Sequence, residues 1–268
     1  MIPRSAACAL TLVLVAASTA PAATPQPDAL VERVIAAVGG EAFAAAGVLE
    51  LTVDEEQTRN DGAASRNRYT AWVDATNLQN ARMQLPGEVI VARGGGEGWS
   101  TTKGVLDDRP QTPGMAARTL NQSLFPLLLP YSLKMEGVWV KEVAEITWEG
   151  RPAWALLIPF TKGFFVNPAL TTTWRVVVAK DDAAILAVDF LPAAEYREVQ
   201  PMGMRYRILK YDEVNGARVP SQILAVGMNL AGQESGATRL TRITPKVYGP
   251  WDPRLFVNPK RLEALEED

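Results

Sequence analysis

The sequence contains no histidine, and this absence excludes a large part of the catalytic repertoire. Without an imidazole there is no Ser-His-Asp or Cys-His catalysis, no histidine general base, and little scope for zinc, copper or iron sites. The single cysteine, Cys8, lies near the N-terminus, so the rest of the chain forms neither a disulfide nor a thiol nucleophile. Metals with oxygen ligands stay possible, but no EF-hand-type calcium loop is present. We therefore expect no cofactor.

A concentration of positive charge is also missing. The chain has 27 Lys and Arg residues against 30 Asp and Glu residues, which gives a net charge of −3. Nucleic acids bind proteins through basic clusters, so a nucleic acid partner is not expected. After residue 22 the chain also lacks an apolar run long enough to span a bilayer. We expect a monomer that does not bind nucleic acid.

The N-terminus has the three parts of a secretory signal peptide. Arg4 supplies the positive charge, residues 6–17 form an uncharged apolar segment, and residues 20–22 (Ala-Pro-Ala) match the small-residue cleavage rule. The alternative, an N-terminal helix of the folded domain, fits less well because the apolar segment lacks amphipathic spacing and leads into prolines. Cys8 lies inside this segment, where a lipid-anchored cysteine would not be placed. We predict a signal peptide over residues 1–22 and export to the periplasm.

The mature chain is predicted to begin with one helix and to continue as β-structure. Asp28 can cap the helix, apolar residues recur at helical spacing over residues 30–38, and Gly39-Gly40 ends it. From residue 48 the apolar period changes to two, and turn signals such as Asn-Gly separate the segments. This pattern predicts about ten antiparallel strands with one apolar face, followed by an extended tail over residues 250–259. The expected strands are 48–58, 66–73, 81–85, 89–92, 138–143, 145–149, 153–158, 172–180, 184–190, 204–211, 219–226 and 238–247.

Residues 105–135 interrupt the strand pattern. A proline-rich loop at 107–114 precedes a leucine-rich stretch that contains Pro126 and Pro130. Because proline removes a backbone donor, this stretch is not expected to form one regular helix or a central strand. We predict short helical turns that lie over the sheet. They could be ordinary core or a lid over an apolar cavity, and the sequence favours neither.

Tryptophans are a possible sugar-binding set, but core packing is the favoured interpretation because several occupy apolar strand positions. Around a turn at residues 150–152, Trp148 and Trp154 are expected to face each other across a hairpin. The seven tryptophans are at positions 72, 99, 139, 148, 154, 174 and 251.

Paired carboxylates could hydrolyse glycosides without histidine. The candidates lie at strand ends or in turns, where solvated acidic residues are common. Similarly, the glycine loop at 94–98 precedes no helix, so a hairpin is favoured over a phosphate site. Arg66, Arg68 and Arg82 are expected on the solvated face of the sheet. The candidate carboxylates are Asp54, Glu55, Glu56, Asp107, Asp108, Asp181, Asp182, Glu195 and Glu198.

The order of these features resembles the LolA-like superfamily, the periplasmic lipoprotein carriers and their lipid-binding relatives. The most recognisable parts are the hairpin at residues 210–220 (KYDEVNGARVP) and the terminal segment at residues 252–259 (DPRLFVNP). The resemblance covers residues 23–268 and implies a single, mainly β domain: a curved antiparallel half-barrel wrapped on the N-terminal helix. It further implies a hydrophobic concave face that holds acyl chains, with no cofactor and no catalysis.

The leading hypothesis is a non-catalytic carrier for a lipid or an acylated lipoprotein, with envelope membrane proteins as further partners. One alternative is an envelope glycan hydrolase that uses a carboxylate pair. Another is a periplasmic sensor of lipoproteins, which would use the same cavity. The expected lining consists of Met83, Leu85, Trp154, Leu156, Val176 and Val178, and the expected lid of Leu124, Phe125, Leu128 and Leu129.

Overall fold

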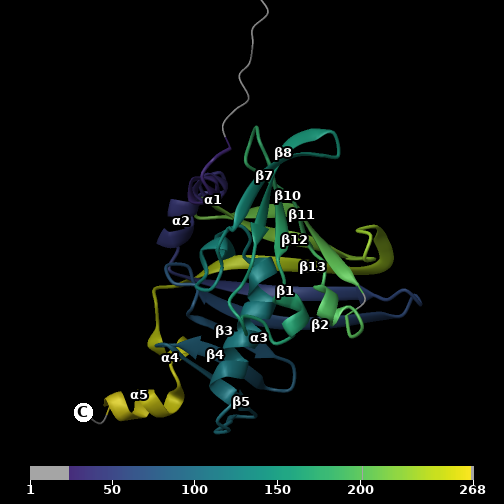
Figure 1. The fold of residues 1–268 in the computed structure, drawn as a ribbon. Coiled ribbons are helices and arrows are strands. Elements are labelled where there is room, and N and C mark those ends of the chain that lie inside the picture. The colour runs from purple at the N-terminus through teal and green to yellow at the C-terminus, as the bar shows by residue number, and fades with distance from the viewer. Residues whose placement is uncertain (1–23, 201, 267–268) are drawn as a thin grey trace, which may run out of the picture.

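One antiparallel sheet of 13 strands forms most of the protein (Figure 1). The computed structural model describes residues 24–200 and 202–266, so the predicted signal peptide lies outside the described residues. The strands follow the order β6-β5-β4-β3-β2-β1-β13-β12-β11-β10-β9-β8-β7, which leaves β6 and β7 as the two edges. They are β1 (Val48–Thr58), β2 (Ala64–Asp74), β3 (Ala81–Leu85), β4 (Val89–Gly94), β5 (Glu97–Thr102), β6 (Val105–Leu106), β7 (Glu142–Trp148), β8 (Arg151–Ile158), β9 (Trp174–Ala179), β10 (Ile185–Phe190), β11 (Gly203–Val214), β12 (Ala217–Met228) and β13 (Glu234–Gly249).

The two halves of the sheet meet at a single pair of strands. Within β1–β6 and within β7–β13, every strand pairs with its neighbour in sequence, as in a meander. Residues 48–58 of β1 pair with residues 238–249 of β13 and join the halves. Alternation along the strands places one set of side chains on the buried face, which in β1 consists of Leu49, Leu51 and Val53. The predicted antiparallel arrangement with one apolar face is confirmed.

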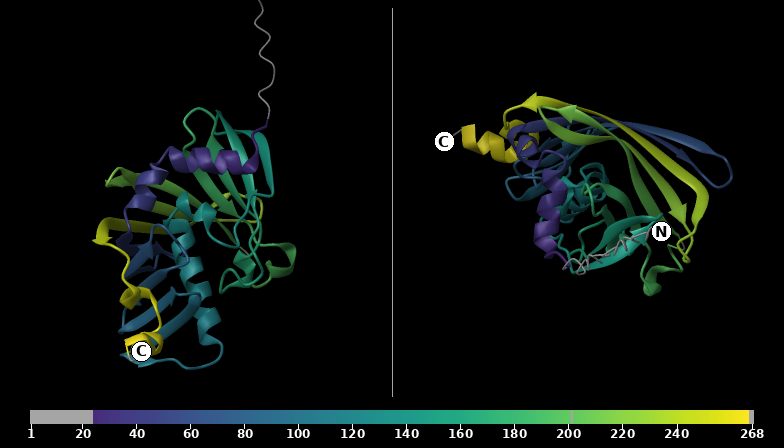
Figure 2. Two further views of the ribbon diagram at one scale, coloured as in Figure 1. Left: turned by 90° about the vertical axis from the view of Figure 1, so that its left-hand side faces the viewer. Right: turned by 90° about the horizontal axis from the view of Figure 1, so that it is seen from above.

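Helices lie on the concave side of the sheet and in its connections. Figure 2 shows the sheet curving around α1 (Pro27–Ala36) and α3 (Thr112–Leu127). The remaining helices are α2 (Gly40–Ala45), α4 (Pro253–Phe256) and α5 (Pro259–Glu266), with the 3-10 helices η1 (Tyr131–Lys134), η2 (Pro168–Leu170) and η3 (Ala194–Tyr196). Within the described residues, none of these helices combines the length and apolarity that crossing a membrane requires.

The first helix was predicted to end at Gly39-Gly40, but α1 ends at Ala36, and Gly39 and Gly40 instead begin α2. Gly39 has a φ of 82°, and a Cβ atom there would lie 2.4 Å from the carbonyl oxygen of Gly216. The Arg218 amide donates a hydrogen bond of 2.8 Å to the Val38 carbonyl. The junction between α1 and α2 therefore packs directly against the β11–β12 turn, which only glycine permits.

The prediction of short helical turns in residues 112–127 is wrong, because these residues form one regular helix, α3. Pro113 lies in the first turn, where its missing N–H has no intrahelical partner to lose. Pro126 lies in the last turn, so only the end of the helix is affected. The helix position also differs from the prediction, because α3 is the helix that packs along β3, β4 and β5, whereas α1 lies beside α2.

Strand number and one hairpin register also differ from the predictions. The sheet has 13 strands rather than about ten, partly because residues 97–106 form β5 and β6. The β7–β8 hairpin turns at Glu149 and Gly150, both with positive φ, so Trp148 pairs with Arg151. This turn is one residue shorter than expected. Trp148 therefore packs on the convex face and Trp154 in the concave core, and the two do not face each other.

The C-terminal segment forms two short helices instead of a fully extended tail. Phe256 is completely buried, and the Trp99 indole N–H donates a 2.6 Å hydrogen bond to its carbonyl oxygen. Leu255 and Phe256 cluster with Val48 and Trp72 on the convex face of β1 and β2. The segment thus covers the outside of the sheet and leaves the concave face free of its side chains.

Candidate functional site

The concave face carries the main hydrophobic core, and all the predicted lining and lid residues belong to it. All are buried members of one cluster except Leu85, which is half-buried and packs against it. Met83 and Leu85 also line a cavity, whereas the others pack within the core. Those core residues are Leu124, Phe125, Leu128, Leu129, Trp154, Leu156, Val176 and Val178.

A cavity of about 260 Å³ lies between α3 and the concave face. Strands from both halves of the sheet contribute to it, so it spans the β1–β13 junction. Its apolar lining consists of Met83, Leu85, Pro126, Leu127, Phe165, Leu170, Trp174, Phe190, Met204 and Ile223. These side chains come from distant parts of the chain, so local sequence patterns do not indicate the cavity that they border.

Helix α3 closes this cavity with one face and enters the core with the other. The buried face consists of Leu120, Leu124 and Leu128, which are spaced four residues apart and lie fully buried in the core. Leu128 directly follows the last residue of the helix. Thr119 and Ser123 follow the same spacing on the adjacent face and line the cavity. The buried face therefore fixes the helix in the core, while the side chains of the other face border the cavity.

Aromatic rings form one wall of the cavity. The Trp174 ring stacks on Phe165, Phe190 and Tyr206, with centroid separations of 5.5, 5.3 and 5.7 Å. Phe125 of α3 meets Trp174 edge-on at 5.3 Å. Phe165 lies in an irregular connection between β8 and η2, so no periodic pattern marks it as a core residue. The aromatic density of residues 160–165, which contain three phenylalanines, is the signal that could have found it.

Four polar side chains lie together in the same lining. Glu55, Tyr69, Tyr206 and Arg239 lie on four different strands, and all four side chains line the cavity. Arg239 donates a hydrogen bond to the Tyr206 hydroxyl, and Glu55 acts on Arg239 electrostatically. Burial raises the pKa of both Tyr69 and Tyr206, so both phenols stay protonated near neutral pH. The lining therefore divides equally between ten apolar side chains and ten polar or charged ones, and the charged pair Glu55 and Arg239 lies beside the two phenols.

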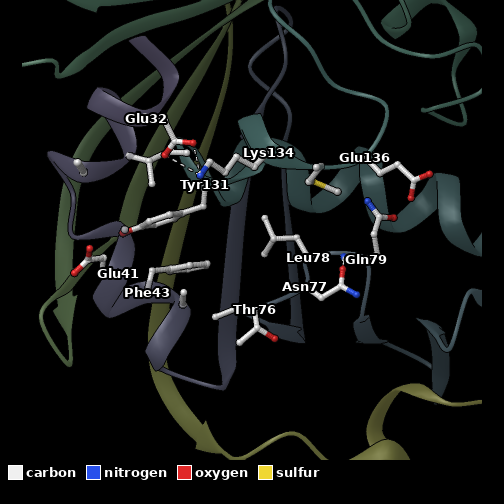
Figure 3. Close-up of a pocket in the computed structure, with 16 residues that line it drawn as sticks. Glu32, Glu41, Phe43, Thr76, Asn77, Leu78, Gln79, Tyr131, Lys134 and Glu136 are labelled. Atoms are coloured by element: carbon white, nitrogen blue, oxygen red, sulfur yellow. Dashed lines mark hydrogen bonds and ion pairs between the residues drawn. The ribbon is translucent and has the colours of Figure 1, made fainter. Parts of the chain in front are cut away.

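A separate cleft of about 820 Å³ lies between α1, α2, η1 and the β2–β3 connection (Figure 3). Phe43 and Tyr131 stack at 3.6 Å in its wall, and Lys134 forms an exposed ion pair with Glu32 at 2.7 Å. Glu41 and Glu136 are labelled on opposite sides of the cleft in Figure 3. The lining of this cleft contains none of the lining or lid residues predicted from the sequence.

The Tyr131 hydroxyl in this wall donates hydrogen bonds to two backbone carbonyls, and removing the hydroxyl tests their contribution to stability. Its Oη lies 2.8 Å from the Val38 carbonyl oxygen and 3.1 Å from that of Arg218. Tyr131→Phe should lower the free energy of unfolding by about 1 kcal/mol, since one buried donor is lost. Urea denaturation measures this loss. Tyr248→Phe, at a tyrosine that is 49% exposed, is the control and should change little. Equal effects of the two variants would contradict the assigned hydrogen bonds.

The candidate carboxylates lie away from the cavity, with one exception. Glu55 lines the cavity and is the one acidic residue within its described lining. The other candidates are turn or surface residues, several of them in ion pairs: Asp54 with Arg68, Glu56 with Arg66, Asp107 with Arg109, and Asp181 and Asp182 with Arg151. The part of the chain that the structure describes also contains no group of three acidic, His or Cys residues that could hold a metal.

The tryptophans do not gather into a sugar-binding set. Trp99, Trp154 and Trp174 are buried, and of all seven only Trp174 lines the cavity within the described residues. Trp139 and Trp251 are each 46% exposed at separate positions in the sequence. The glycine loop at 94–98 is the turn of the β4–β5 hairpin, as predicted.

No family model matches the chain, and no curated protein is similar to it in sequence. Solved structures do match its fold. The LolA superfamily protein NE2245 from Nitrosomonas europaea matches with a TM-score of 0.57 and 11% identity, over 88% of this chain and 99% of that one. A DUF1329 family protein from Desulfovibrio piger matches with a TM-score of 0.54 and 11% identity, over 89% of this chain and 100% of that one. A putative outer membrane lipoprotein-sorting protein domain from Vibrio parahaemolyticus matches with a TM-score of 0.53 and 10% identity, over 88% of this chain and 97% of that one. The chain therefore has a LolA-like fold.

Proposed function

We propose that this chain, with its LolA-like fold, is a non-catalytic periplasmic carrier for a lipid or an acylated lipoprotein. The observation that carries the proposal is the cavity between α3 and the concave face of the sheet, whose apolar wall includes Trp174, Phe190 and Met204. An acyl chain gains about 0.8 kcal/mol for each CH₂ group that it buries in such a site. The fold is shared with a structure described as a putative lipoprotein-sorting domain, which supports the same class of ligand.

The cavity must enlarge to accept a whole acyl chain. Its volume of about 260 Å³ is below the range of about 300–1,000 Å³ that small-molecule sites typically have. Pro126, Leu127, Phe165 and Leu170 are the apolar lining residues outside the sheet, and the last three have side chains that can rotate without breaking strand pairing. In this proposal Met83 and Leu85 contact the chain first, and the other predicted lining and lid residues support the cavity from the core.

The hydrolase alternative lacks a corresponding arrangement of side chains. Glycoside hydrolysis needs two carboxyl groups about 5 to 9.5 Å apart on either side of a bound sugar. Within the described lining of the cavity, Glu55 has no second acidic residue beside it. A carrier needs only burial and a way to release its ligand, which favours the carrier over the enzyme.

Native mass spectrometry of the protein purified from a bacterial envelope tests the proposal directly. We expect an additional mass of a lipid that disappears when the protein is denatured. The same preparation, after delipidation, should bind cis-parinarate saturably with a rise in fluorescence. A protein that carries no lipid and binds no probe would contradict the carrier function.

Filling the cavity from α3 should block binding without unfolding the protein. Ser123 is half-buried and faces the cavity, so the indole in Ser123→Trp enters empty space and not packed core. We expect probe affinity to fall about tenfold or more, equivalent to about 1.4 kcal/mol, with little change in thermal midpoint. Met115→Trp on the same helix, at a residue that is 39% exposed, is the matched control. Unchanged affinity in Ser123→Trp would show that ligands bind elsewhere.

A further inference from the structure

Arg239 is an arginine that lies inside the ligand cavity. Strand β13 alternates between the two faces of the sheet, and Arg242, three residues further on, lies on the convex face. The Arg242 side chain is 51% exposed and approaches Glu56 at 3.5 Å. Arg239 instead joins Tyr206, Trp174 and the other cavity residues. The same strand thus offers an internal arginine and an external one for comparison.

The Arg239 guanidinium leaves one of its hydrogen-bond donors unpaired among the described residues. Its Nε atom is buried and has no hydrogen-bond partner within the described part of the chain. Tyr206 accepts one of its hydrogen bonds, and Glu55 acts on it through space without a hydrogen bond. A buried donor without a partner costs about 1–3 kcal/mol, and more when it is charged. An acceptor delivered by a ligand would recover this loss.

Two phenol groups border the same place. Tyr69 and Tyr206 are both buried, and both line the cavity with Arg239. Because the Tyr206 oxygen accepts from Arg239, its own proton remains available to a second acceptor. The result is a set of donors at the margin of an apolar space. Such a set suits an anion, since charge-assisted hydrogen bonds are the strong ones.

We infer that the ligand is an amphiphile with an anionic head group, a carboxylate or a phosphate, bound by Arg239 and Tyr206. Its apolar chain lies along the wall formed by Trp174, Phe190 and Met204. Glu55 lines the same cavity and repels the head group, which keeps affinity moderate and release possible. This inference rests on the proposed function, because it assumes that an acyl chain occupies the cavity.

A pair of probes that differ only in charge tests the inference. Cis-parinarate and its methyl ester have the same chain, but only the acid carries a negative charge near neutral pH. The wild-type protein should bind the acid about tenfold more tightly than the ester, as expected for a charge-assisted hydrogen bond. Arg239→Gln should remove this preference by weakening the acid alone. Arg242→Gln, the convex-face control, should leave both affinities unchanged.

Glu55→Gln should change the affinity for the acid in the opposite direction from Arg239→Gln in the same assay. Removal of the repelling carboxylate should tighten binding of the acid several-fold and leave the ester as it is. This variant keeps the test decisive if Arg239→Gln fails to fold. Inorganic phosphate should not displace the probe, because a free anion lacks the chain, and displacement by it would overturn the inference.

The outcomes separate this inference from the proposed function. Equal binding of acid and ester by the wild-type protein, or an unchanged ratio in Glu55→Gln, would overturn the anionic head group and leave the carrier function intact. Absence of binding for both probes would instead overturn the carrier function.

Discussion

Leu128→Asp is expected to abolish folding. Leu128 directly follows α3, is completely buried, and belongs to the core cluster on the concave face. An aspartate there would have to be ionised without a partner or protonated in an apolar site, and either costs several kcal/mol. Natural domains are stable by only about 5–15 kcal/mol, so one such change consumes much of the total. The expected result is an unfolded or insoluble protein.

The matched variant is Ser123→Asp, which places the same charge on the cavity face of α3. It should fold with a nearly normal thermal midpoint and lose affinity for an uncharged acyl probe such as methyl parinarate. Circular dichroism and probe titration on both variants separate the two roles of the helix. If Leu128→Asp folds normally and loses only probe binding, residue 128 belongs to a movable lid and not to the core.

Much of the sheet could be predicted because its signals are local. Residues 203–228 alternate in polarity around Asn215-Gly216, and Asn215 and Gly216 both have positive φ in the structure, as a two-residue hairpin turn requires. A single residue of error in turn length was enough to misplace Trp148, which lies on the convex face and not opposite Trp154. Because side chains alternate with period two, that error exchanged the two faces.

Helix α3 could not be predicted from local signals. Its sequence contains Pro113, Gly114 and Pro126, which indicate loops when the tertiary context is unknown. Short helices owe most of their stability to burial of an apolar face. Here Leu120, Leu124 and Phe125 provide that burial in the core, where α3 packs along β3, β4 and β5 and Phe125 also meets Trp174 of β9.

The cavity was only partly predictable for a different reason. Period-two patterns indicate which residues point inward, but not which inward residues leave space between them. Met83 and Leu156 both point inward, yet only Met83 borders the cavity. Glu55 points into the cavity as well, and it was interpreted as a solvated residue at a strand end because it is charged.

An ion-pair network on the convex face supports the cavity wall from behind. Asp189 is 5% exposed and lies opposite both Arg175 and Arg205 in the strand register. Arg205 binds it with two hydrogen bonds, of 2.7 and 2.9 Å, and Arg175 binds the same carboxylate. The Trp148 ring contacts both guanidinium groups, with their Cζ atoms 4.7 and 5.2 Å from its centroid. The network therefore joins β9, β10 and β11 at one point.

The opposite face of these three strands carries Trp174, Phe190 and Tyr206, the aromatic wall of the cavity. Asp189→Asn should lower stability by about 3 kcal/mol, since it leaves two adjacent guanidinium groups without their shared counter-charge. The thermal midpoint should fall by about 6–12 °C for a chain of this size. Acyl probe affinity should fall as well, because the strand spacing behind the rings is no longer fixed. Asp181→Asn, at an exposed carboxylate that also pairs with an arginine, should change neither quantity. A thermal midpoint equally insensitive to both substitutions would show that the convex network does not hold the wall.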